Sequence, residues 1–136
     1  MSEYRLPHLA TSVPTARRLA EEAAAPRIDG SKVGDFVLMV SEAVSNAVLH
    51  APPMSDGRIL LTFESNEEAV RGVVTDGGSM FVPNPEPGAE DQARQHFGLS
   101  IIDALSSRWG VTVDDATNVW FEVDAPRRSS TTDADP

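Results

Sequence analysis

A long apolar segment between residues 31 and 51 constrains the fold more strongly than any other part of the chain. At the helical spacing of about 100° per residue, apolar side chains cover most of its circumference. Pro52 and Pro53 follow directly, and neither can continue a helix. The pattern predicts a buried core helix around which the rest of the chain packs. A narrow polar strip runs along this helix and is formed by Asp35, Glu42, Asn46 and His50.

Shorter segments on either side predict a small α+β domain. Two further helices are expected, one over 13–25 with Ser12 as its N-cap and one over 98–108. Five strands are expected, over 4–9, 58–65, 70–75, 109–114 and 118–123. The order of these elements predicts an α+β two-layer sandwich, in which the helices pack on one face of a mixed, mostly antiparallel sheet.

The length of 136 residues allows one domain, which we place at residues 1–126. Residues 127–136 are rich in Ser, Thr and Asp. They are expected to be disordered, because they cannot bury enough apolar surface to offset their chain entropy. The segment 83–95 contains three prolines and is expected to be a mobile loop, of the kind that serves as a lid or a binding segment in small domains.

The charge and the absence of cysteine exclude several functions. Lys and Arg number 11 against 21 Asp and Glu, which gives a net charge of −10. Simple binding to the backbone of DNA or RNA needs a basic face and is excluded, and docking on an anionic membrane is disfavoured. With no cysteine, the chain has no disulfide, thiolate metal site or cysteine nucleophile. Without an apolar run of about 20 residues or an apolar leader, the protein is expected to be cytoplasmic.

The polar strip on the core helix contains a candidate chemical pair. Glu42 and Asn46 are four residues apart, so their side chains share one face of the helix. An amide oxygen suits Mg²⁺, and a carboxylate can take a proton from an attacking hydroxyl or water. A solvated strip on an ordinary amphipathic helix would give the same spacing. A polar strip on a helix that is otherwise apolar, however, must face a pocket or be paired.

Two glycine-containing segments add candidate binding positions. Asp76-Gly77-Gly78 follows directly on a predicted strand, where the carboxylate could accept from an exocyclic amine such as that of adenine. A tight turn would have the same sequence. Gly98-Leu99 opens the last predicted helix, whose free N–H groups could receive an anion, although glycine there also simply eases a bend.

Taken in order along the chain, these segments resemble the Bergerat-type ATPase domain shared by gyrase, sensor histidine kinases and MutL. Residues 40–51 look like the N box of its small, stand-alone branch, the anti-sigma-factor serine kinases and their relatives. Residues 74–79 resemble the adenine box. The similarity covers about residues 4–125, and its other matching segments are 12–18, 97–105, 108–111 and 119–123.

The resemblance implies a role for each matching residue. Asn46 would hold Mg²⁺ against the phosphates of ATP, and Glu42 would be the general base for the attacking hydroxyl. Asp76 would accept from the adenine amino group, with Gly78 allowing close approach. Gly98, followed by Leu99, would open the helix that receives the phosphates. Phosphoryl transfer requires mainly positioning and charge neutralisation, which this set of groups could supply.

Three departures from the family pattern tend toward weaker nucleotide binding. His96 stands where the last box normally has its first glycine, so its side chain would crowd the backbone around the phosphates or itself donate to one. Met80 replaces the second glycine of the adenine box. Thr117 and Asn118 stand where the family often has Lys-Thr before the closing strand.

The resemblance implies a regulator that acts by partner switching. Such a kinase binds a sigma factor, phosphorylates a serine of an anti-anti-sigma protein and forms homodimers. The acidic charge fits protein targets, because a sigma factor has basic DNA-binding surfaces. Arg17 and Arg18 are candidate partner contacts, although an ordinary solvated surface charge is the favoured interpretation of each. The alternative function is a non-catalytic binding module of the same fold, with weak or lost ATP binding. The ATPase half of a two-component sensor is disfavoured, because no dimerisation helix or phospho-acceptor segment is visible.

Overall fold

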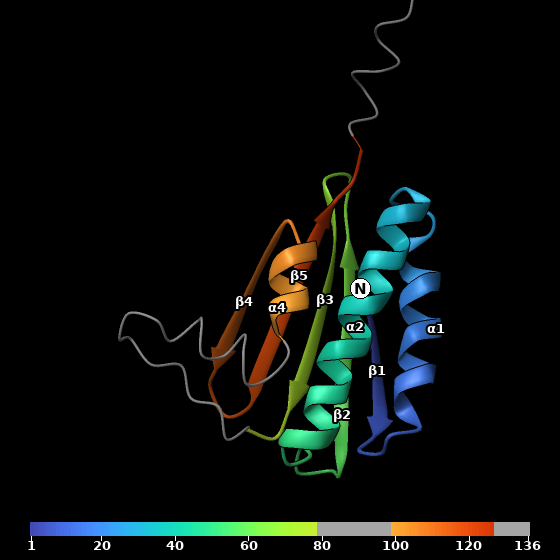
Figure 1. Ribbon diagram of the computed structural model, residues 1–136. Helices are drawn as coiled ribbons and strands as arrows, with labels where there is room; N and C mark the ends of the chain where they lie inside the picture. Colours follow the sequence, from blue (N-terminus) through green and yellow to red (C-terminus); the bar gives the residue numbers. More distant parts are fainter. Residues whose placement is uncertain (79–98, 127–136) are drawn as a thin grey trace, which may run out of the picture.

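In the part of the chain that the structure describes, the β-sheet contains five strands in the order β1-β2-β3-β5-β4, and every pairing between them is antiparallel. The computed structural model describes residues 1–78 and 99–126, and the helices of this part cover one face of the sheet (Figure 1). The strands are β1 (Ser2–Pro7), β2 (Arg58–Ser65), β3 (Ala69–Asp76), β4 (Arg108–Val113) and β5 (Thr117–Asp124). The helices are α1 (Ser12–Ala24), α2 (Gly30–His50) and α4 (Leu99–Leu105). The predicted α+β two-layer sandwich is confirmed, and its described sheet is antiparallel throughout.

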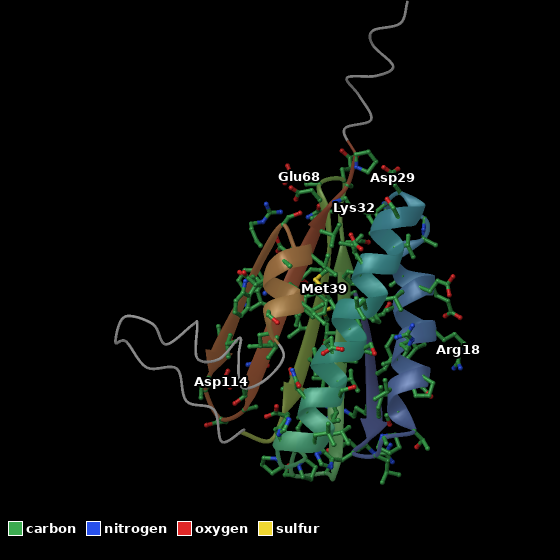
Figure 2. The ribbon with its side chains drawn as sticks, viewed as in Figure 1. Arg18, Asp29, Lys32, Met39, Glu68 and Asp114 are labelled. Atoms are coloured by element: carbon green, nitrogen blue, oxygen red, sulfur yellow. The ribbon has the colours of Figure 1, made fainter. Side chains whose placement is uncertain are left out.

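Helix α2 lies across the centre of the sheet and supplies much of the core. The ring of Phe36 packs at 5.9 Å from that of Phe63 on β2 and at 5.6 Å from that of Phe121 on β5. Met39, which Figure 2 labels, is fully buried on the same helix. Full burial of a large apolar side chain contributes about 1.5–3 kcal/mol, so this contact anchors α2 to the sheet.

The prediction that α2 is buried over most of its circumference was wrong on one side. Leu38 is 38% exposed and Leu49 is 73% exposed. The sheet covers one face of α2 and α1 packs beside it, which leaves the side that carries these two leucines open to solvent.

Helix α1 packs closely because its inner face is formed by alanines. Ala16, Ala20 and Ala24, spaced by four residues, are completely buried. The predicted N-cap, Ser12, lies one residue after the observed one. Thr11 is the capping position, and Ser12 is the first helical residue. The buried Ser12 Oγ instead donates to the Pro7 carbonyl at 2.6 Å and ties α1 to the end of β1.

Element ends otherwise differ from the predictions by a few residues. Helix α4 ends at Leu105, before the predicted residue 108, because the chain already enters β4 at Arg108. The predicted loop over 83–95 and the predicted tail over 127–136 lie outside the described residues. Within the described part, no helix has the length and apolar character needed to cross a membrane.

Candidate functional site

A pocket opens where several elements meet. Two of them, α2 and β3, end at the lower edge of the sheet in Figure 1. The C-terminal half of α2 forms one wall, and the end of β3, parts of β4 and β5 and the start of α4 form the others. Among the described residues most of the wall is apolar, and four of them bring polar side chains to it. The lining residues are Ala43, Asn46, Ala47, His50, Ala51, Val74, Asp76, Leu99, Val111, Thr117 and Val119.

Asp76 brings a carboxylate into this apolar pocket. It is the last residue of β3 and only 6% exposed. Burial raises the pKa of the Asp76 carboxyl above its usual 3.8, while the N–H of Gly78 and the charge of His8 act to lower it. The Gly78 N–H donates to Asp76 Oδ1 at 2.9 Å. Among the described residues no hydrogen bond to Oδ2 is found, so this oxygen can accept from a molecule in the pocket.

Thr117 completes the polar end of the pocket, whereas the sequence analysis named it only as a departure from the family pattern and not as a site residue. It lies directly opposite Asp76 in the β3–β5 pairing and is 2% exposed. The next residue, Asn118, accepts a hydrogen bond from Thr75 Oγ1 at 2.7 Å, so these two side chains pair with each other. Side chains alternate between the faces of a strand, and the pocket therefore receives the threonine and not the asparagine.

The two members of the predicted helix pair have different positions. Asn46 lines the pocket together with Asp76, as the polar strip led us to expect. Glu42 lies one turn earlier on α2, is half-buried and is absent from the described residues that line the pocket. The structure thus brings Asn46 and Asp76 together, and the role of Glu42 as a base stays a prediction.

The two glycines after Asp76 meet different structural needs. The Gly77 N–H donates to the Pro52 carbonyl at 3.0 Å, and a Cβ at Gly77 would lie 1.9 Å from the Pro53 carbonyl oxygen. Gly78 has a φ of 103°, which side-chain-bearing residues rarely adopt, and a Cβ there would lie 4.0 Å from the Asp115 carbonyl oxygen, an ordinary contact distance. Gly77 therefore allows the chain to approach itself closely and Gly78 supplies the turn, while the role of Gly78 in a close approach to adenine stays a prediction.

Of the remaining predicted positions, Leu99 alone lies among the described residues. Leu99 is the first residue of α4, is buried and lines the pocket. Gly98 and His96, as well as the substituted position Met80, lie outside the described residues.

The chemistry of the pocket suits a flat and largely apolar group that carries an N–H donor. Alanine and valine side chains provide contact surface, while Asp76 provides an acceptor and Thr117 a hydroxyl at one end. The amide of Asn46 lies on the opposite wall, on α2. A ligand with a heterocyclic amine and a more polar extension would use each of these groups.

Comparison with known proteins is consistent with this geometry. A family model described as the histidine kinase-like ATPase domain matches residues 6–122, which is most of the chain. No curated protein matches the sequence significantly.

Proposed function

Since the chain belongs to the histidine kinase-like ATPase domain family, we propose that it is an anti-sigma-factor-type serine kinase. An ATPase domain of this type binds ATP. In the proposed function, the protein uses Mg·ATP to phosphorylate a serine of an anti-anti-sigma partner while it sequesters a sigma factor. The observation that carries the proposal is the buried Asp76 carboxylate beside Thr117 at the end of an apolar pocket.

The adenine end of the ligand is assigned to Asp76. A carboxylate accepts hydrogen bonds only, so it favours an exocyclic amino group over a carbonyl at the same place. This preference would distinguish adenine from guanine, whose ring carries an oxygen at the corresponding position. The valines and alanines of the pocket wall would contact the faces of the ring.

The phosphate end of the ligand is assigned to the side of the pocket that contains Asn46 and Leu99. The Asn46 amide oxygen would hold Mg²⁺, which prefers oxygen ligands and keeps several waters and phosphate oxygens around it. When bound, Mg·ATP supplies the phosphoryl group and the ion neutralises charge that develops during transfer.

Glu42 is the proposed general base. In the transfer step, the serine oxygen of the partner bonds to the γ-phosphorus, its proton passes to the Glu42 carboxylate, and ADP leaves. Two features support this role. Glu42 is on the same helix as Asn46, one turn away, and it is half-buried outside the adenine pocket. A base that acts on a hydroxyl of a second protein has to be reachable from outside.

The proposed partners are proteins, and the charge of the chain supports this. A net charge of −10 favours basic surfaces such as those of a sigma factor. Arg18 lies on the outer side of α1, pointing away from the sheet, where a partner can reach it (Figure 2). A homodimer is part of the same proposal.

A phosphorylation assay tests the kinase activity. The protein is mixed with Mg·ATP labelled at the γ-phosphate and with purified anti-anti-sigma proteins of the same organism, one at a time. Label on a serine of one of them, lost with Glu42→Gln and retained with Glu64→Gln as the control, is the expected result. Glu64 is exposed on β2 and is not among the pocket residues.

A non-catalytic binding module of the same fold is the second candidate. The departures from the family pattern at Met80 and His96 favour it. In that case the protein binds a sigma factor or its antagonist, and none of the tested partners becomes labelled.

A further inference from the structure

The residues that follow α2 cap its C-terminal end only in part, through the Ala51 N–H, which donates to the Ala47 carbonyl at 3.3 Å. The last carbonyl groups of a helix have no partner within the helix and need donors from elsewhere. Here the chain continues through Pro52 and Pro53, which have no N–H to donate. A donor for the carbonyl groups beyond Ala47, such as that of Ala51, must therefore come from another segment or from solvent.

His8 supplies that donor from the corner between β1 and α1. Its Nε2 lies 3.0 Å from the Ala47 carbonyl oxygen and 2.7 Å from the Ala51 carbonyl oxygen. Because carbonyl oxygens only accept, Nε2 carries a proton and donates to both. The partial negative charge at a helix C-terminus makes this a favourable place for a histidine ring.

The corner that holds His8 is itself fixed by hydrogen bonds. The Leu9 N–H donates to the Pro7 carbonyl at 2.8 Å, and Ser12 Oγ donates to the same oxygen at 2.6 Å. The preceding residues pair with β2 over the full length of β1. The backbone at His8 is therefore fixed, and the hydrogen bonds of its imidazole can restrain the end of α2.

The residues that accept from His8 are part of the pocket. Ala47 and Ala51 line it on the α2 side, facing the wall that contains Asp76. The segment after Ala51 is fastened from the other side, by the Gly77 N–H on the Pro52 carbonyl. The charge of His8 also acts on Asp76, where it opposes the rise in pKa that burial causes. His8 thus contacts one wall of the pocket and influences the carboxylate in the other.

We propose that His8 is a positioning residue that holds the last turn of α2 as a fixed wall of the pocket, at the spacing that a purine base requires. The part of this inference that concerns the base rests on the proposed function. The part that concerns the wall does not, because it follows from the hydrogen bonds of His8 alone.

Three variants of the full-length protein test the proposal. His8→Ala removes the donor. His8→Gln restores an N–H close to the position of Nε2 but cannot become charged. Leu9→Ala alters the neighbouring side chain, which is 57% exposed, and serves as the control. Each is compared with the wild type by amide hydrogen exchange and by calorimetric titration with ATP and magnesium.

Amide exchange tests the wall without any ligand. With His8→Ala, the amides of residues 48–51 are expected to exchange about tenfold faster, the factor that corresponds to one lost hydrogen bond. The amides in the first half of α2 should keep their rates. His8→Gln and Leu9→Ala should behave like the wild type. Unchanged exchange at residues 48–51 in His8→Ala would overturn the proposal.

The titration tests the role toward the base. His8→Ala is expected to bind ATP about tenfold more weakly, with His8→Gln restoring most of the affinity. Wild-type affinity in His8→Ala, despite faster exchange, would overturn the positioning role. If even the wild type does not bind ATP, the proposed function fails and with it the assignment of a purine base. The exchange rates would still decide whether His8 holds the wall.

Discussion

Asp76 and Thr117 lie directly opposite each other on β3 and β5, and both side chains line the same pocket. They are 41 positions apart in the sequence, and the antiparallel pairing of the two strands brings them together (117 − 76 = 41). This pair gives the apolar pocket its polar end. The structure therefore connects the fold with the proposed adenine site through one cross-strand register.

Replacing Asp76 by Asn is expected to raise the melting temperature at pH 7. The pKa of Asp76 is raised by burial above 3.8 in the folded state, so ionisation favours the unfolded chain. The wild type therefore loses free energy of unfolding as the pH rises from 3.8 through the higher folded pKa. Asp76→Asn does not lose free energy of unfolding in this way, because its side chain cannot ionise. It also keeps an oxygen that can accept the hydrogen bond from the Gly78 N–H.

Thermal denaturation between pH 3 and pH 7 measures this difference. The melting temperatures of Asp76→Asn and the wild type should agree near pH 3 and should differ by a few degrees at pH 7. Asp56→Asn, which removes an exposed carboxylate paired with Arg5, is the control. A lower melting temperature for Asp76→Asn at pH 7 would contradict the account of the buried charge.

Gly77→Ala is expected to destabilise the fold, because the new methyl group would lie 1.9 Å from the Pro53 carbonyl oxygen. Overpacking of this kind costs about 1–3 kcal/mol. Gly34→Ala is the matched control, since no atom lies within 4 Å of the added Cβ on α2. That change should stabilise by up to about 1 kcal/mol through helix propensity. Urea denaturation distinguishes the two, and equal stability of both variants would refute the close contact.

Asn46→Ala is expected to remove the magnesium dependence of ATP binding. The Asn46 amide is the proposed protein ligand of the ion, so without it ATP should bind equally weakly with and without magnesium. Glu42→Gln should leave both affinities close to those of the wild type, because Glu42 does not line the pocket. Calorimetric titrations measure this, and an unaltered magnesium effect in Asn46→Ala would remove Asn46 from its proposed role.

Glu122→Gln is expected to lower stability slightly at neutral pH. Hydrogen bonds from Arg108 and Arg71 hold the pKa of the Glu122 carboxyl below its usual 4.5. This stabilisation is present above pH 4.5 and is lost as the pH falls through the depressed folded pKa. The arginines are partly exposed, so the effect should not exceed about 1 kcal/mol. Melting curves of the two proteins should converge in acid, and a gap that persists there would show another cause.

The sequence alone was sufficient for the main elements and for the family. Apolar periodicity and terminal prolines located α2, and alternating residues located the two hairpins. The motifs quoted from residues 40–51 and 74–79 pointed to the ATPase domain, and the family match confirms this. The stand-alone kinase branch stays a proposal.

The parts that were missed depend on contacts between distant segments. Thr117 enters the pocket because of the register between β3 and β5, which local patterns do not encode. His8 becomes relevant only once β1 places it beside the end of α2. The exposure of Leu38 and Leu49 depends on how far the sheet and α1 surround α2, and helical periodicity cannot measure that.

Titration of the wild-type protein and of Asp76→Asn with ATP, in the presence of magnesium, tests the central claim most directly. The account predicts that the wild type binds ATP in preference to GTP and that Asp76→Asn, although folded, loses most of this binding. Absence of heat of binding to the wild type at millimolar ATP, or full binding by Asp76→Asn, would contradict the assignment of this pocket to adenine.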